Sequence, residues 1–251
     1  MTALTPTAAP TRTRVLSQAR FETATLLRNG EQLLVALVLP AMALVGLTLA
    51  PYPSLGDGRR IDVATAGVLG LAVVSTAFTG QAISTGFDRR YGVLRFLGVS
   101  PLGREGLLAG KALAVLVVLA VQVLVLGGLG FAMGWRPDGG GLLPALITLV
   151  LGSGTFVALA LLLAGTLRAE AVLALANLIW VVMLGLGLLT PTALLPGALS
   201  GIAPYLPSGA LGDAMRATLV QGQWPLGAWL VLIVWAVVAS ALTSRFFRWA
   251  P

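Results

Sequence analysis

The sequence predicts an all-α membrane protein with about six transmembrane helices, an N-terminal amphipathic surface helix and a short cytoplasmic helix between spans two and three. Hydrophobic residues make up 57% of the 251 residues and charged residues 10%, whereas a soluble domain carries about 25% charged residues. The mean hydropathy is +0.95. Apolar stretches long enough to cross a bilayer recur along the chain. This composition excludes a secreted, a cytosolic and a disordered protein.

The chain contains no cysteine and no histidine. Disulfides, thiolate metal sites and a cysteine nucleophile are therefore excluded, and the commonest metal ligand and general base is missing. The balance is basic, with 16 Lys and Arg against 9 Asp and Glu. In so apolar a chain this excess indicates loops that set membrane orientation rather than a nucleic-acid surface.

The N-terminal part divides into a tail and a helix. Residues 1–11 are rich in Thr, Ala and Pro and predict a disordered cytoplasmic tail, and residues 12–251 predict a single transmembrane domain. In residues 12–32, apolar positions such as Val15, Leu16 and Ala19 recur at helical spacing among arginines and glutamates. We expect an amphipathic helix at the membrane surface; the alternative is a short solvated linker.

Six apolar stretches follow, and each is long enough to cross about 30 Å of hydrocarbon. They cover residues 33–51, 63–87, 107–134, 142–167, 171–191 and 226–244. The apolar stretch 192–225 is interrupted by Pro196, Pro204 and Pro207. We expect short helices there, at the outer surface or re-entrant; a seventh span is the alternative.

The distribution of positive charge predicts the orientation. With the N-terminus in the cytoplasm, the cations of the inner segments are Arg12, Arg14, Arg20, Arg28, Arg89, Arg90, Arg95, Arg104, Lys111, Arg168, Arg245 and Arg248. The outer segments then hold Arg59, Arg60, Arg136 and Arg216. The positive-inside rule favours this arrangement, with both termini in the cytoplasm.

The segment between spans two and three, residues 88–105, is too long and too patterned for a passive turn. Val93, Phe96 and Leu97 stand at i, i+3 and i+4 among arginines, and Ser100-Pro101 would end such a helix. A short amphipathic helix of this kind can dock into a groove of a cytoplasmic partner. The alternative is a loop whose arginines only hold it inside.

Span two is the most polar span. Ser75, Thr76 and Thr79 share one helical face, and Asn177 is the strongly polar residue of span five. Hydroxyls within a membrane either bond across helices or line a wet path, and an amide at that depth needs a partner. We predict that these four residues lie at a translocation path or a dimer interface, and one face can serve both.

The sequence lacks the residues that a proton relay or a phosphate-binding loop would require. Asp88, Glu105 and Glu170 lie at the edges of the predicted spans, which argues against a proton relay at membrane depth. A phosphate-binding loop needs Gly-x-x-x-x-Gly-Lys-Ser/Thr, but Ala112 follows Gly110-Lys111 and Glu105 stands at the first glycine position. We therefore predict no catalytic residue and no metal ligand, and we interpret Lys111 as an interfacial anchor.

Two further features have a simple structural interpretation. Gly130 and Gly134, near the end of span three, would permit close approach of another helix. Arg168 and Glu170 would form a solvated hairpin between spans four and five. The alternative for that hairpin is a minor contact with a cytoplasmic partner.

The ordered motifs together resemble the permeases of ABC-type exporters, in particular the type-2 family that moves drugs, polysaccharides and lipids. The segment 89–111 carries a charged pair, Gly92, a later charge, Ser100-Pro101-Leu102 and Gly110-Lys111. Residues 27–30, 168–178, 195–196, 204–207 and 213–216 resemble the family's motifs around spans one, five and six. Gly30 replaces a proline of the family pattern, and Arg90 and Arg95 stand where acidic residues are common.

The resemblance implies a six-span permease domain that works as a dimer, with a second copy or a close relative, on two cytoplasmic ABC ATPase subunits. ATP and Mg would bind those subunits, and no cofactor is expected in this chain. The implied ATPase-coupling residues, in a helix over residues 89–97, are Arg89, Arg90, Tyr91, Leu94, Arg95, Phe96 and Leu97.

The location implied is the bacterial cytoplasmic membrane, and the apolar spans favour a hydrophobic or amphipathic cargo. Two alternatives belong to other classes: a membrane scaffold or assembly factor that transports nothing, and a secondary transporter driven by an ion gradient.

Overall fold

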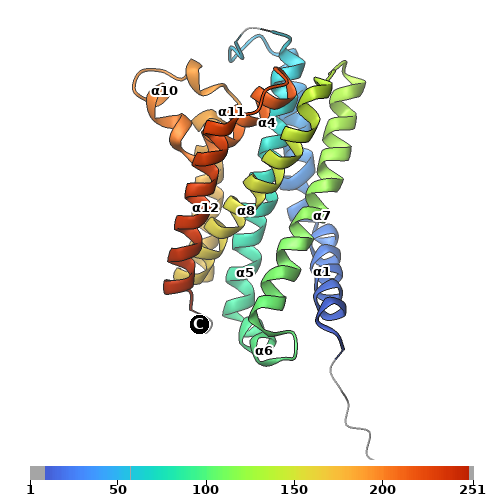
Figure 1. Ribbon diagram of the computed structural model, residues 1–251, viewed down its shortest axis with the longest axis vertical. Helices are drawn as coiled ribbons and strands as arrows, with labels where there is room; N and C mark the ends of the chain where they lie inside the picture. Colours follow the sequence, from blue (N-terminus) through green and yellow to red (C-terminus); the bar gives the residue numbers. More distant parts are fainter. Residues whose placement is uncertain (1–8, 57, 249–251) are drawn as a thin grey trace, which may run out of the picture.

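A computed structural model describes residues 9–56 and 58–248 of the chain, and these form helices and turns without a strand (Figure 1). In chain order the α-helices are α1 (Thr11–Arg28), α2 (Gly30–Leu33), α3 (Leu39–Leu49), α4 (Arg60–Val73), α5 (Gln81–Arg90), α6 (Val93–Val99), α7 (Gly103–Ala132), α8 (Leu142–Thr166), α9 (Ala169–Met183), α10 (Leu199–Ile202), α11 (Pro207–Leu219) and α12 (Leu226–Phe246). Three π-helices, η1 (Leu34–Val38), η2 (Val74–Gly80) and η4 (Leu184–Leu188), and three 3-10 turns, η3 (Gly139–Gly141), η5 (Thr192–Leu194) and η6 (Ala203–Tyr205), join them.

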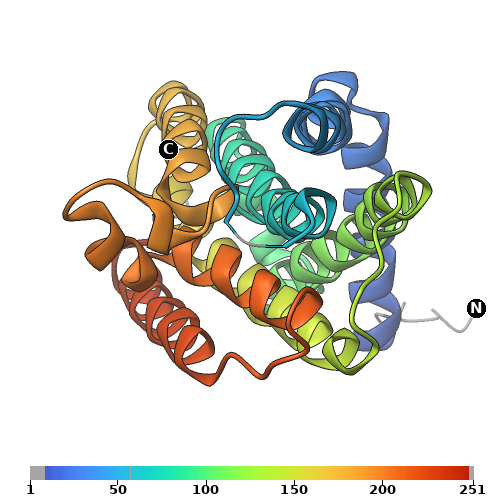
Figure 2. The same cartoon turned by 90° about the horizontal axis from the view of Figure 1, so that it is seen from above.

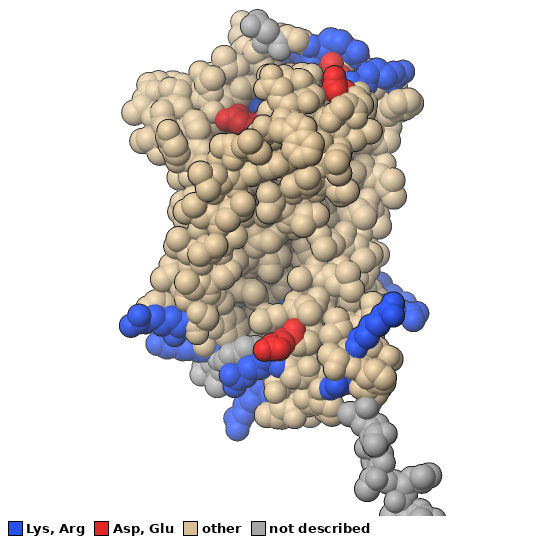
Figure 3. Space-filling view, in the orientation of Figure 1, with Lys and Arg blue, Asp and Glu red and all other residues tan. Residues whose placement is uncertain are grey.

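The long helices stand side by side as an upright bundle (Figures 1 and 2). Helices α1 and α6 and the last described residues lie at one end, which we call the α6 end. Helices α10 and α11 lie at the other end, which we call the α10 end. Charged side chains gather at the two ends, and the surface between them is uncharged on the face that Figure 3 shows. A belt of this kind is what a lipid bilayer requires.

The described part of the chain confirms the prediction of an all-α membrane protein with about six spans. Five helices are long and apolar enough to cross a membrane: Arg60–Arg90, Gly103–Ala132, Gly139–Thr166, Ala169–Leu188 and Leu226–Phe246. A shorter apolar helix, Ala36–Leu49, takes the place of the predicted first span. The protein is therefore a multi-pass integral membrane protein. The predicted tail over residues 1–11 lies largely outside the described residues.

The interrupted stretch 192–225 forms short helices, as predicted, and not a seventh span. Its longest helix is α11, with 13 residues. Leu211 and Met215 of α11 are fully buried. Gly152 of α8 permits this contact, because a Cβ there would lie 2.8 Å from a methyl group of Leu211. The segment therefore packs into the bundle as a cap at the α10 end.

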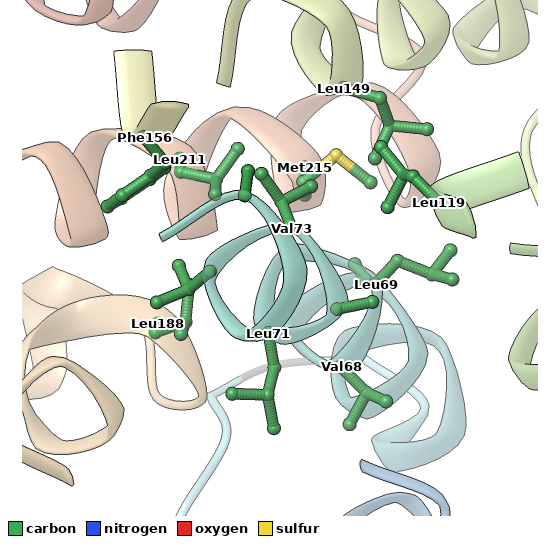
Figure 4. Close-up of a cluster of buried hydrophobic side chains, with 14 of the residues drawn as sticks. Val68, Leu69, Leu71, Val73, Leu119, Leu149, Phe156, Leu188, Leu211 and Met215 are labelled. Carbon is green, nitrogen blue, oxygen red and sulfur yellow. The ribbon is translucent and has the colours of Figure 1, made fainter. Parts of the chain in front are cut away.

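Span two, which runs without interruption from α4 through η2 to α5, lies at the centre of the bundle. Inside this span 94% of the apolar window is buried, against 17% in the last span, α12. Figure 4 shows Val68, Leu69, Leu71 and Val73 of α4 pointing outward on different sides of the helix. Their neighbours in that view are Leu119, Leu149, Phe156, Leu188, Leu211 and Met215. The most polar span is thus the one most shielded from lipid.

Helix α1 confirms that the N-terminal segment is helical, but the helix packs along α7. A Cβ at Gly110 of α7 would lie 2.8 Å from the Gln18 side chain, and one at Gly106 would lie 3.7 Å from Val15. Gly110 therefore lets the helices approach closely, whereas the distance at Gly106 is that of an ordinary contact. The segment is a helix that belongs to the bundle, and the solvated linker is not observed.

The predicted pair of glycines in span three does two different things. At Gly130 a Cβ would lie 2.9 Å from the Thr65 hydroxyl of span two, so this position does bring two helices together. Helix α7 ends at Ala132, and Gly134 has a φ of 99°, a conformation that favours glycine. The role expected for Gly134 in helix packing is therefore wrong, because this residue forms the turn after the helix.

Candidate functional site: a cavity beside span two and the helices at the α6 end

A cavity of about 310 Å³ lies against span two, and all four predicted polar residues line it: Ser75, Thr76, Thr79 and Asn177. The remaining wall is mostly apolar and comes from α1, the first span, α5, α7 and α9; it includes Leu26, Leu33, Ile83, Phe87, Val118 and Leu173. Residues that are far apart in the sequence thus form one site.

One side of the cavity is held by two linked hydrogen bonds, which use a carbonyl that Pro40 leaves without a helical donor. Pro40 has no N–H group, so the carbonyl of Ala36, four residues earlier, has no helical donor. The Gln122 amide of α7 donates to this carbonyl at 2.6 Å, and its oxygen accepts from the Thr76 hydroxyl at 2.8 Å. The chain of bonds ties the first, second and third spans together at the cavity.

Ser75 and Thr79 differ in how their hydroxyls are used. The Ser75 hydroxyl accepts a hydrogen bond of 2.9 Å from the Trp180 indole, which fixes span five to span two. The Thr79 hydroxyl is buried and has no hydrogen-bond partner within residues 9–56 and 58–248. An unpaired buried hydroxyl is unfavourable by about 1–3 kcal/mol. Both residues lie in η2, and π-helical segments are frequent at functional sites.

Asn177 lies in α9 beside the cavity, and its side chain is exposed. The amide donates a hydrogen bond of 2.9 Å to the Leu173 carbonyl of its own helix. The partner that an amide needs within the membrane is therefore provided here by its own helix. The amide thus presents a polar group at the cavity wall, in a span that is otherwise apolar.

The segment between spans two and three is a helix, but this helix begins later than predicted. Helix α5 continues to Arg90, Tyr91 and Gly92 form a turn, and α6 begins at Val93. Gly92 has a φ of 74°, which a side chain would disfavour. The predicted single helix over residues 89–97 is therefore two helices joined at a glycine turn. The break falls at Gly92, a residue type that both a helix and a turn can accommodate.

The predicted coupling residues fall into two groups. Arg89 is buried and donates to the carbonyls of Gly165, at 2.7 Å, and of Leu167, while Arg90 pairs with Glu170. Both arginines therefore join the end of span two to the turn between α8 and α9. This contact gives the predicted hairpin at Arg168 and Glu170 a structural role.

The other group lies on α6 and its turn. Tyr91 and Phe96 are 71% and 73% exposed, and Arg95 is also exposed. Leu94 is buried and Leu97 is half-buried, so these two hold α6 against the bundle. The helix therefore presents aromatic surface at an end of the molecule that is rich in arginine.

A buried ion cluster close to α6 was not predicted. Lys111 of α7 is 2% exposed and contacts Glu22 of α1 at 2.9 Å and Asp88 of α5 at 2.7 Å. The interpretation of Lys111 as an interfacial anchor is therefore wrong, because the ammonium group is buried between two carboxylates. Each of the three charges lies on a different helix, so sequence spacing gave no sign of the cluster.

A further buried cation lies at the α10 end. Arg216 of α11 donates to the carbonyls of Gly187 at 2.6 Å and Leu188 at 2.9 Å, and it pairs with Asp213 at 2.7 Å. These carbonyls are free because η4 breaks at Gly187, where φ is 86°. Burial lowers the pKa of the Arg216 guanidinium, and Asp213 opposes this shift. The group remains a cation that caps span five.

Comparison with known proteins identifies one family. A family model described as "ABC-2 family transporter protein" matches residues 34–245, which cover all six apolar helices. A search of curated proteins finds no match.

Proposed function

The chain belongs to the ABC-2 transporter family and is the membrane component of an ABC transporter rather than its ATPase; from this premise we propose that it works as an ATP-driven exporter. Two such subunits, identical or closely related, would form the translocation path between them. ATP and Mg would bind the partner ATPases. The α6 end would face the cytoplasm of a bacterial cell, with both termini inside, because most cations of the chain lie in segments of that end.

The observation that carries the proposal is that one continuous span lines the polar cavity from its middle onward and leads at its end into the exposed helix α6. Span two lines the cavity at Ser75, Thr76 and Thr79 and ends at Arg90, immediately before the turn into α6. A force on α6 therefore acts on the helix that forms the cavity wall. Helix α7, which follows α6 and lines the cavity at Val118, is connected to α6 in the same way.

The surface of α6 fits a docking role. Tyr91 and Phe96 are exposed aromatic residues, and such residues are enriched in protein interfaces. Arg95 beside them favours a groove with negative charge on the ATPase. The N-terminal helix α1 would move together with span two, because the ion pairs of Lys111 join α1 to the end of this span.

The cavity supports a hydrophobic or amphipathic cargo. Its described wall is apolar apart from hydroxyl and amide groups such as Thr79 and Asn177. A site of this kind binds an apolar body and orients it through few polar contacts. Asn177 also lies where a second permease subunit could complete the wall, since an amide in the membrane gains from a further partner.

The proposal is tested by co-purification with the ATPase from native membranes. The variant carries Arg95→Glu and Phe96→Asp, which reverse the charge and remove the aromatic surface of α6 without touching its buried side. We expect a soluble subunit with a phosphate-binding loop to accompany the wild type and to be lost from the variant.

A matched control is Tyr205→Asp, because Tyr205 is 69% exposed but lies near the α10 end. It should retain the ATPase. If the wild type carries no ATPase, the scaffold and the gradient-driven carrier gain support. An ATPase that stays on the double variant would place the contact elsewhere than on α6.

A further inference from the structure

We propose that the outer surface formed by α8, α9 and α12 binds one anionic phospholipid, with an acyl chain in an apolar groove and the phosphate at Arg245 and Arg248. This site lies apart from the cavity of the proposed function. It is inferred from three features of the described residues: a groove, a cationic recess that continues it, and a chain segment that holds the arginines in place.

The groove has a volume of about 390 Å³ and an almost wholly apolar wall. Its sides include Leu159 and Leu163 of α8, Ile179 and Val182 of α9, and Trp235 of α12. Val182 is 48% exposed, and the window of α12 is 17% buried, so these helices face lipid. A hydrocarbon chain is the occupant that such a wall favours in a bilayer.

The cationic recess meets the groove at Thr166, which lines both. It has a volume of about 360 Å³ and is lined by Thr166, Arg245, Phe246, Phe247 and Arg248. Arg245 and Arg248 are exposed, and no acidic residue belongs to the described wall. A basic pocket between spans, directly below an apolar groove, is complementary to a phosphate with an attached acyl chain. A zwitterionic headgroup would bring its own cation to this recess.

The segment that carries Arg248 is held by Gly165 of α8. The N–H of Arg248 donates to the Gly165 carbonyl at 3.1 Å. The Phe247 ring lies directly over the glycine, because a Cβ at Gly165 would lie 2.2 Å from this ring. The backbone that carries the two arginines is therefore held in place before a ligand binds, which reduces the entropy lost on binding.

The test is a lipid titration followed by native mass spectrometry in detergent, with phosphatidylglycerol and phosphatidylcholine of equal chain length as probes. We expect the wild type to retain one phosphatidylglycerol in preference to phosphatidylcholine. The double variant Arg245→Gln, Arg248→Gln should lose about 30-fold in affinity for phosphatidylglycerol, because each basic residue near an anionic lipid contributes roughly a factor of five.

The matched control is Arg12→Gln, Arg20→Gln, which removes the same charge from exposed positions of α1. Helix α1 lies on the opposite side of the bundle from α12 (Figure 1). This control should bind phosphatidylglycerol as the wild type does. Equal losses in both double variants would show a general charge effect and overturn the site, as would unchanged binding in the Arg245, Arg248 variant.

A second variant tests the groove without changing charge. Val182→Trp puts a large side chain into the groove at a position that already faces lipid, so the fold should tolerate it. It should weaken phosphatidylglycerol binding. Unchanged binding would contradict the placement of the acyl chain in this groove. A competition experiment with equimolar glycerol phosphate provides a further test: full displacement of the lipid would show that the site binds a free anion and not a phospholipid.

Discussion

Each end of the bundle buries an arginine that donates to backbone carbonyls, Arg89 at the α6 end and Arg216 at the α10 end, but among the described residues the α6 end adds a buried lysine between carboxylates. At the α6 end, Lys111 meets two carboxylates from two other helices. At the α10 end, Arg216 mainly meets backbone carbonyls of the broken end of span five. Ion pairs between side chains can be exchanged when helices shift, whereas carbonyls at a helix terminus are fixed by the fold. We infer that the helices at the α6 end change position during transport, whereas the helices at the α10 end keep their arrangement.

The strongest test of this comparison is Arg216→Met. The substitution leaves the carbonyls of Gly187 and Leu188 without their side-chain donor and removes the cation that pairs with Asp213, so we expect the free energy of unfolding to fall by about 3–5 kcal/mol. A melting-temperature measurement in detergent would show the loss. Arg136→Met is the control, because Arg136 is exposed at the same end, and it should change stability by less than about 1 kcal/mol.

Lys111→Met should be somewhat milder, at about 3 kcal/mol, because Asp88 is 30% exposed and water can partly replace its partner. In addition, this variant should lower ATPase-driven transport per folded molecule, since ion pairs no longer join α1 to span two. The triple variant Lys111→Met, Glu22→Gln, Asp88→Asn leaves no unpaired charge and should regain stability without regaining coupling.

The comparison would fail if the triple variant restored transport fully. That result would show that the ion cluster only stabilises the fold. If the triple variant recovered stability and transport to the same degree, Lys111 and Arg216 would both be purely structural, and the proposed difference between the two ends would not exist.

Gln122→Leu addresses the region between the ends. It removes the bonds to Thr76 and to the Ala36 carbonyl, and hydrogen bonds between membrane helices contribute about 0.6–2 kcal/mol each. We expect a loss of about 1–2 kcal/mol in detergent unfolding. A larger loss than that of Lys111→Met would show that the middle of the bundle contributes more to the free energy of unfolding than the ion cluster at the α6 end.

Thr79→Val should have the smallest effect on stability, close to zero or slightly favourable, because it replaces an unpaired buried hydroxyl by a methyl group. Its effect on cargo binding should be larger, since we assign this hydroxyl to the cargo. Ser75→Ala, which removes the acceptor for Trp180, should show the reverse pattern in a paired stability and transport assay.

The sequence predicted the helices and the polar cavity residues because these depend on local patterns. Apolar length defines a span, and Ser75, Thr76 and Thr79 share a face at any helical register. It did not predict the turn at Gly92, because a single glycine does not reveal whether a helix bends. Lys111 was misjudged, and the burial of Arg216 was not predicted, for one reason: most of their partners lie on other elements, and burial of a charge is decided by tertiary packing.

The central claim, that force enters at the α6 end and leaves the α10 end intact, is tested most directly by hydrogen–deuterium exchange. The assembled transporter would be measured in nanodiscs with and without a non-hydrolysable ATP analogue. The account predicts that the analogue changes exchange in residues 11–28 and 93–99 and leaves residues 207–219 unchanged. A change confined to residues 207–219, or none in residues 93–99, would contradict it.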